Sequence, residues 1–194
     1  MTTRPDRRPR RTRRTPVRLR RLPLSSVYRL LEPGPVVLLT TAAAGRLNVM
    51  AMSWQTMVEF VPPLVACVVS RANHSRKALL ASGECVIAIP SHRLAPLVVK
   101  IGNTSGRDVD KFRTFDLTPI EGTEVDAPRI AECYANLECR VHDTTLVARY
   151  DLFILEVVAA WTDPAQKWPR FIHHRGRGSM VIDGPVRRYV SSKP

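Results

Sequence analysis

Short apolar runs separated by polar breaks dominate the chain, and their lengths are typical of β-strands. Residues 36–41 (VVLLTT), 64–70 (LVACVVS) and 85–89 (CVIAI) are almost wholly apolar and rich in β-branched side chains. Such runs predict buried strands. Residues 47–54 follow the first run after the turn sequence AAAGR, so we expect these two segments to pair as a hairpin.

Two longer apolar segments, residues 134–141 and 148–160, bring the expected strands to six. The predicted helices are few and lie between strands, at residues 24–31, 74–82 and 91–101. Residues 102–112, 119–128 and 161–178 are expected to be irregular, the first with a helical turn from Asp108. This arrangement predicts a mainly β fold, a β-barrel with helical insertions, rather than a doubly wound sheet.

The composition fits one globular domain, which we place at residues 22–194. No apolar run reaches the 18 residues of a membrane helix, and no apolar segment of a secretory signal follows the first arginines. Cys67 and Cys85 lie inside apolar strand-like runs, where we expect buried free thiols. None of the four cysteines forms a C-x-x-C pair, so we expect a reducing cytoplasm and no zinc site.

The net charge of +13 is concentrated at the start of the chain. Residues 1–21 hold ten arginines and one aspartate, which is about +9 of that charge. We expect this segment to be a disordered basic arm. Such an arm can bind nucleic acid or an anionic membrane, or it can be a dispensable extension, which we favour.

Several families are excluded by missing motifs. The chain has no G-x-G-x-x-G, Walker loop, G-x-S-x-G or H-E-x-x-H. His173 and His174 are adjacent and would point to opposite faces of a strand. They are therefore weak evidence for a metal site.

A polar cluster stands where the third strand is expected to end and the helix at 74–82 to begin. Arginine, hydroxyl groups and free N–H groups at a helix start together favour a phosphate. The sequence therefore predicts an anion-binding pocket at Ser70, Arg71, Asn73, His74 and Ser75.

Five segments, in this order and spacing, carry a resemblance to a known family. They are SWQTMVEFVPPLVACVV, SRANHSRKALLASGECVIAIP, GNTSGRDVDKF, APRIAECYANLECRV and LFILEVV. Over residues 34–184 the chain resembles the flavin-reductase-like, FMN-binding split-barrel family, which includes flavoredoxins and NAD(P)H:flavin oxidoreductases. The resemblance implies a homodimer of six-stranded split barrels with FMN near the subunit boundary.

The resemblance also implies which residues contact FMN. Along the isoalloxazine ring it places Met52, Ser53, Trp54, Gln55 and Thr56. On the ribityl chain and phosphate it places Ser70, Arg71, Asn73, His74 and Ser75. Covering the flavin from the other side it places Gly102, Ser105, Lys111 and Phe112, with Lys111 near the N1–O2 edge of the ring.

The residue types agree with these roles, because Met52, Trp54 and Phe112 can form apolar walls around a ring system. Structural alternatives stay open at this point. Trp54 can be a core residue, Arg71 a solvated surface charge, and Lys111 a partner of a neighbouring aspartate, Asp108 or Asp110.

Two positions depart from many relatives of that family. Tyr150-Asp151 stand where a histidine is common, and Met180 stands where a tyrosine is common. Both approach the nicotinamide or substrate side of the flavin in the family. The chain's histidines that could compensate are His142, His173 and His174.

The function expected from this resemblance is that of an FMN-dependent flavin reductase. Hydride would pass from NAD(P)H to flavin N5, and the electrons to an acceptor such as a partner monooxygenase. No side chain is expected to act as acid or base, because proximity supplies most of the effect. The alternatives are an FMN-binding electron carrier without NAD(P)H turnover, and a barrel that binds nucleic acid through its arginine-rich arm.

Overall fold

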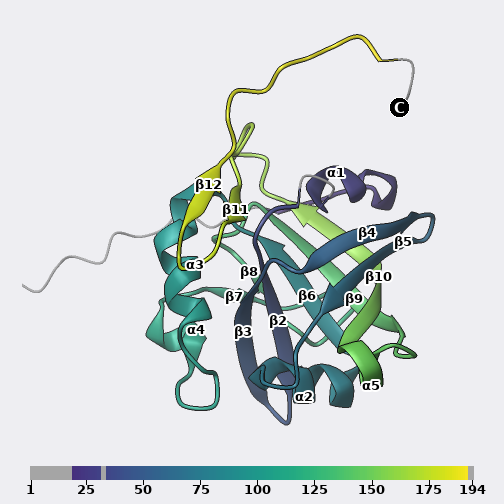
Figure 1. The fold of residues 1–194 in the computed structure, drawn as a ribbon, viewed down its shortest axis with the longest axis vertical. Coiled ribbons are helices and arrows are strands. Elements are labelled where there is room, and N and C mark those ends of the chain that lie inside the picture. The colour runs from purple at the N-terminus through teal and green to yellow at the C-terminus, as the bar shows by residue number, and fades with distance from the viewer. Residues whose placement is uncertain (1–18, 32–33, 192–194) are drawn as a thin grey trace, which may run out of the picture.

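One large antiparallel sheet forms the body of the protein (Figure 1). The structure is a computed structural model that describes residues 19–31 and 34–191. Residues 1–18 of the expected arm at residues 1–21 therefore lie outside the described residues. The strands of the sheet are β1 (Arg20–Arg21), β2 (Val37–Ala43), β3 (Arg46–Met52), β4 (Gln55–Phe60), β5 (Pro63–Val68), β6 (Glu84–Ile89), β9 (Ala135–Asp143) and β10 (Leu152–Thr162).

The strands follow the order β3-β2-β6-β9-β10-β5-β4, and β1 adds to β10. Figure 1 shows the sheet curling around its interior, with α3 and α4 beside β3 and with α2 and α5 together at one end. The predicted hairpin is confirmed, because β2 and β3 pair from Val37 with Met52 to Ala43 with Arg46. Its turn has positive φ at Ala44 (49°) and Gly45 (73°), which is the two-residue turn geometry that hairpins favour.

The mainly β class is confirmed, but the sheet has eight strands within the described residues rather than six. One addition is β1, in which Arg20 and Arg21 pair with Thr162 and Trp161. Regular structure thus begins inside the segment that we expected to be a disordered arm.

The other addition is the edge strand β4. Its exposed positions include Val58 and Phe60, so it lacks the buried face that makes a strand recognisable in a sequence. A register shift between Met57 and Glu59 interrupts its pairing further.

The helices are short and lie around the sheet. They are α1 (Tyr28–Leu31), α2 (His74–Ser82), α3 (Ala95–Gly102), α4 (Lys111–Thr114) and α5 (Val147–Tyr150), with 3-10 turns η1 (Leu24–Ser26) and η2 (His92–Leu94). The prediction for α2 is confirmed at both ends, and Gly83 ends it with a φ of 69°. Pro96 is tolerated because it stands in the first turn of α3, where no intrahelical N–H bond is lost.

The prediction of a strand from residue 148 is wrong. Residues 147–150 form α5, and the chain then turns through Asp151 at a φ of 55° before β10 begins at Leu152. The loops also hold two small hairpins that we did not expect. They pair β7 (Pro119–Ile120) with β8 (Arg129–Ile130), and β11 (Ile172–His174) with β12 (Met180–Ile182).

The core has two main parts. One fills the sheet's interior around Leu39, Phe153 and Leu155, and the other lies under α3 and α4 around Ile101 and Phe112. All four cysteines are buried and free, as predicted for Cys67 and Cys85. Burial raises the pKa of the Cys67 thiol to about 12, so it stays protonated and unreactive at neutral pH.

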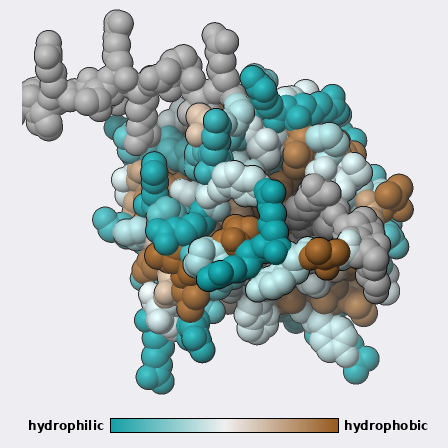
Figure 2. Space-filling view, turned by 90° about the horizontal axis from the view of Figure 1, so that it is seen from above, coloured by the Kyte–Doolittle hydropathy of each residue, from teal (hydrophilic) through white to brown (hydrophobic). Residues whose placement is uncertain are grey.

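The surface mixes hydrophilic and hydrophobic side chains on the face shown in Figure 2. Exposed large hydrophobic side chains on and beside β4 include Trp54, Val58, Phe60 and Val61. Within the described residues, no helix is long and apolar enough to cross a membrane.

Candidate functional site

Two adjoining cavities lie where β3, the start of α2 and the end of α3 meet. The first, of about 290 Å³, is lined by Asn48, Met50, Ala51, Ala72, Asn73, His74, Ser75, Ile101, Gly102, Asn103, Thr104, Ser105, Gly106 and Lys111. The second, of about 220 Å³, is lined by Val36, Ala51, Met52, Ser53, Val98, Val99, Gly102, Asn103, His174, Gly178 and Met180. Because Ala51, Gly102 and Asn103 line both, the two cavities share a wall.

The cavities differ in character. Amides, hydroxyls and one ammonium group surround the first cavity. The second adds the apolar side chains of Val36, Met52, Val98 and Met180 to the polar groups of Ser53, Asn103 and His174. A ligand with a charged polar end and an apolar ring would match this pair of environments.

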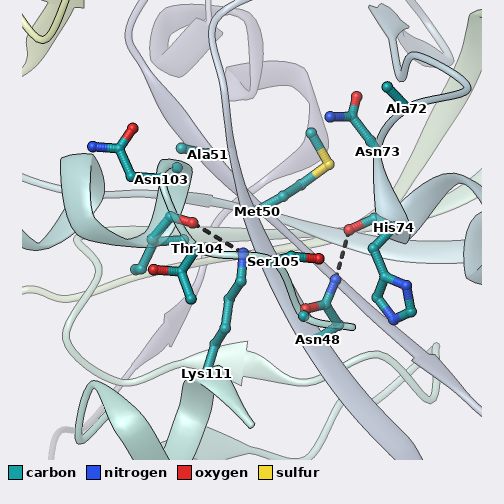
Figure 3. Close-up of a pocket in the computed structure, with 14 residues that line it drawn as sticks. Asn48, Met50, Ala51, Ala72, Asn73, His74, Asn103, Thr104, Ser105 and Lys111 are labelled. Carbon is teal, nitrogen blue, oxygen red and sulfur yellow. Dashed lines mark hydrogen bonds between the residues drawn. The ribbon is translucent and has the colours of Figure 1, made fainter. Parts of the chain in front are cut away.

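Lys111 places a cation in the first cavity. Its side chain comes from the first position of α4 and is only 3% exposed. The ammonium Nζ donates to the backbone oxygens of Val49 and Ile101, each at 2.9 Å. In Figure 3 it extends to the centre of the labelled residues, between Asn48 and Thr104.

No carboxylate of the described residues forms an ion pair with Lys111. Asp110 instead caps α4, accepting the Arg113 backbone N–H at 3.1 Å. Burial lowers the pKa of Lys111, because the charged form is poorly solvated there. A buried cation without a carboxylate partner is a candidate for binding an anion.

Asn48 links the two polar walls of the first cavity. Its Nδ2 donates to the Ser75 hydroxyl at 2.8 Å, which ties β3 to the first turn of α2 (Figure 3). On its other side, Asn48 packs directly on Gly106. A Cβ at Gly106 would lie 1.9 Å from Asn48 Oδ1, so only glycine lets the loop approach this closely.

The start of α2 offers unused donors to the same cavity. Asn73 is the N-cap, but its side chain makes no capping bond. Within the described part of the chain, the backbone N–H groups of His74 and Ser75 have no hydrogen-bond partner. These are the free donors that a helix start presents to an anion, and the helix dipole favours the same charge.

The second cavity is completed by the unexpected β11–β12 hairpin, which brings His174 and Met180 to it. The other two histidines considered from the sequence are engaged elsewhere. His173 contacts Asp183 at 2.7 Å and the Gly34 backbone oxygen at 3.1 Å. His142 lies 3.4 Å from Glu156.

The structure brings together eight of the fourteen residues expected to contact FMN. The first cavity holds Asn73, His74, Ser75, Gly102, Ser105 and Lys111, and the second holds Met52, Ser53 and again Gly102. The residues that line neither cavity are Trp54, Gln55, Thr56, Ser70, Arg71 and Phe112.

Three of those outlying residues have distinct environments. Trp54 is 72% exposed, so it is not a core residue. Phe112 is buried in the second core cluster rather than turned toward the cavities. Gln55 donates to the Pro35 backbone oxygen at 2.6 Å.

Arg71 is directed away from the first cavity in this structure. Its side chain is 65% exposed and its Nε lies 3.4 Å from Asp151 Oδ1. Its Nη2 donates to the backbone oxygen of Ala148. Lys111, which we expected near the N1–O2 edge of the ring, lines the polar cavity at the start of α2, whereas Arg71 lines neither cavity.

The sequence reasoning missed several lining residues, chiefly Asn48, Met50, Ala51, Ala72, Asn103, Thr104 and Gly106. Asn48 is the informative case, because a polar residue inside an otherwise apolar return strand is a signal of a buried hydrogen bond. The others are small or neutral and carry no such signal.

Comparison with known proteins gives the family. A family model described as "Flavin reductase like domain" matches residues 29–179. The chain is 34% identical over 175 residues to the uncharacterized protein YddH of Escherichia coli (strain K12), covering 83% of this chain and 93% of that protein.

Solved structures agree in fold. One is an FMN-binding domain of a flavin reductases-like enzyme from Shewanella baltica OS155, with a TM-score of 0.84, 28% identity and coverage of 91% of this chain and 100% of that one. Another is the flavoredoxin of Desulfovibrio vulgaris (Miyazaki F), with a TM-score of 0.73, 24% identity and coverage of 82% and 91%. The chain belongs to the flavin reductase like family and has its FMN-binding split-barrel fold.

Proposed function

We propose that the two adjoining cavities bind one FMN, and that the protein is an NAD(P)H-dependent flavin oxidoreductase. The observation that carries the proposal is the buried Lys111 ammonium beside the free N–H groups of α2. A helix start and a cation in one polar cavity suit the phosphate and ribityl chain. The apolar cavity next to it suits the isoalloxazine ring.

The residues that line the two cavities then bind different parts of FMN. Lys111, Asn73 and the backbone N–H groups of His74 and Ser75 bind the phosphate end. Met52 and Val98 exclude water from the ring, and Ser53 supplies a polar contact at its edge. Bound FMN would supply the redox chemistry, with hydride from NAD(P)H entering at N5. We assign no acid or base among the side chains, because positioning the two reactants supplies the main effect.

We also propose a homodimer. The edge strand β4 and the residues beside it expose Trp54, Val58 and Val61, which are costly to leave in water and on an unprotected strand edge. A second copy that covers this edge would bury them, and a two-fold symmetric dimer is the commonest assembly. The flavin would then lie near that boundary, as the family resemblance implies.

An electron carrier that binds FMN without NAD(P)H turnover is the second candidate. It is favoured by Met180, which lines the apolar cavity where a tyrosine is common in the family. Asp151, at the other departing position, lines neither cavity, so it leaves the walls unchanged. The cytoplasm stays the expected compartment, supported by four buried free cysteines.

The test is a visible spectrum of the purified protein, before and after NADH or NADPH is added without oxygen. We expect a yellow protein, or one that turns yellow with added FMN, and bleaching by one of the two nucleotides. Binding without bleaching would favour the electron carrier. A protein that binds neither FMN nor riboflavin would contradict both candidates.

A further inference from the structure

Asp151 holds the turn at residues 70–73, which precedes α2, although it is 80 residues away from Arg71 of that turn in the sequence. It follows the short helix α5 with a left-handed φ of 55°, a conformation that aspartate tolerates better than most residues. This backbone turn directs its carboxylate toward residues 69–76, and the side chain is only 18% exposed.

The contacts of Asp151 reach three points of that segment. Its backbone oxygen accepts the Val69 N–H at 3.0 Å, before the turn. Its Oδ2 accepts the Arg71 backbone N–H at 3.0 Å, within the turn. Its Oδ1 accepts Arg76 Nε at 3.0 Å, from the first turn of α2, and lies 3.4 Å from Arg71 Nε.

These contacts attach the turn at residues 70–73 to the rest of the protein. Apart from the Arg76 N–H bond to the Asn73 backbone oxygen at the start of α2, every hydrogen bond from residues 70–73 to another element within the described part of the chain ends on Asp151 or Ala148. The turn's other bonds are local, from the N–H groups of Ala72 and Asn73 to Ser70. Ala72 and Asn73 both line the polar cavity.

Charge supports the same arrangement. Burial raises the pKa of Asp151, but the Arg71 N–H and the charges of Arg76 and Arg71 outweigh it and lower the pKa below its ordinary value. The carboxylate is thus charged at neutral pH and holds two guanidinium groups. Arg71 is held on the Asp151 side, which leaves the cavity to Lys111.

We propose that Asp151 is a positioning residue for anion binding: it fixes the 70–73 turn so that the N–H groups at the start of α2 face the phosphate of the flavin. This rests on the proposed function. Asp151 touches no part of the cavity and acts through the turn. An FMN phosphate depends on this alignment, whereas riboflavin, which has no phosphate, does not.

The test compares Asp151→Gly and Asp151→Asn with the unmodified protein. Glycine removes the carboxylate without strain at positive φ, and asparagine keeps the shape while it loses the charge. Asp116→Gly is the matched control, because Asp116 also has a positive φ (53°) after a short helix and lines neither cavity. FMN and riboflavin affinities are measured for each by fluorescence titration.

We expect Asp151→Gly to weaken FMN affinity by roughly tenfold or more. Removing a residue that orients a metal ligand weakens metal affinity by a similar factor. The riboflavin affinity of Asp151→Gly should change less than about threefold. Asp116→Gly should change the affinity for neither ligand. Asp151→Asn should fall between, because an amide oxygen still accepts the Arg71 N–H.

Three results would overturn the proposal in distinguishable ways. If the unmodified protein binds FMN and riboflavin equally, the phosphate site of the proposed function fails too. If it prefers FMN and Asp151→Gly keeps that preference, only the positioning role fails. If both ligands weaken in parallel, Asp151 supports the fold rather than the phosphate.

Discussion

Asn48 and Ser75, 27 residues apart in the chain, meet through a buried hydrogen bond of 2.8 Å that joins β3 to the first turn of α2. This bond sets the helix start against the strand that runs along both cavities. The Asn48 side chain also meets the backbone of Gly106. One amide thereby fixes the distance between the helix and the loop that precedes α4.

A double-mutant cycle tests that bond. Asn48→Ala should lower the free energy of unfolding by about 1–3 kcal/mol, because the Ser75 hydroxyl loses its buried donor. Ser75→Ala should cost less, and the double variant less than the sum of the two, by about 1 kcal/mol of coupling. Urea unfolding of the four proteins measures this. Strict additivity would show that the two side chains do not interact.

Gly106→Ala tests the close approach of the loop. Its Cβ would meet Asn48 Oδ1 at 1.9 Å, so we expect a loss of about 1–3 kcal/mol of stability through overpacking, with weaker FMN binding. Gly184→Ala is the control, since nothing lies within 4 Å of a Cβ at that position. Equal melting temperatures for the two variants would contradict the contact.

Lys111→Met tests the cation. Removing one charge-assisted contact costs about 1.5–3 kcal/mol, so FMN affinity should fall roughly ten- to hundredfold. Riboflavin should be affected much less. Lys100→Met, at an exposed position of α3, should leave both affinities unchanged. Isothermal titration checks this, and unchanged FMN affinity in Lys111→Met would remove Lys111 from the phosphate site.

The lowered pKa of Lys111 predicts a pH dependence of the flavin-free protein. Between that lowered pKa and the ordinary value of 10.5, the unfolded chain binds more protons at this site than the folded chain. The free energy of unfolding should therefore gain a contribution as pH rises through this window. Lys111→Met lacks this contribution. The free energy of unfolding of the unmodified protein minus that of Lys111→Met should therefore increase with pH. A constant difference from neutral to alkaline pH would argue against a lowered pKa.

Val58→Lys tests the proposed dimer. A charge on the exposed edge strand β4 should block pairing of two copies, leaving a species near the chain mass of 21.8 kDa in sedimentation. Leu80→Lys, at a similarly exposed position on α2, should stay dimeric. A monomeric unmodified protein that still holds FMN would defeat the proposal.

The sequence by itself determined the elements whose signals are local. The helix from His74 to Ser82 has a glycine stop, and the hairpin from Val37 to Met52 has a turn that glycine allows, so both could be predicted. The family followed from five segments in order. Buried free thiols at Cys67 and Cys85 followed from the apolar runs that contain them.

Only the tertiary structure decided which side chains share a cavity. Arg71 looked like the phosphate ligand because it lies two residues before Asn73, but its contacts are with Asp151, 80 residues away in the sequence. Asn48 was overlooked because its partners, Ser75 and Gly106, are distant in the chain. Strand β4 was also missed, because most of its side chains are exposed and its sequence lacks the alternation of buried and exposed positions that marks a strand. Hydrogen bonds and ion pairs depend on the distance between two groups in space. The number of residues between two groups predicts that distance only when both lie in one strand or one helix turn.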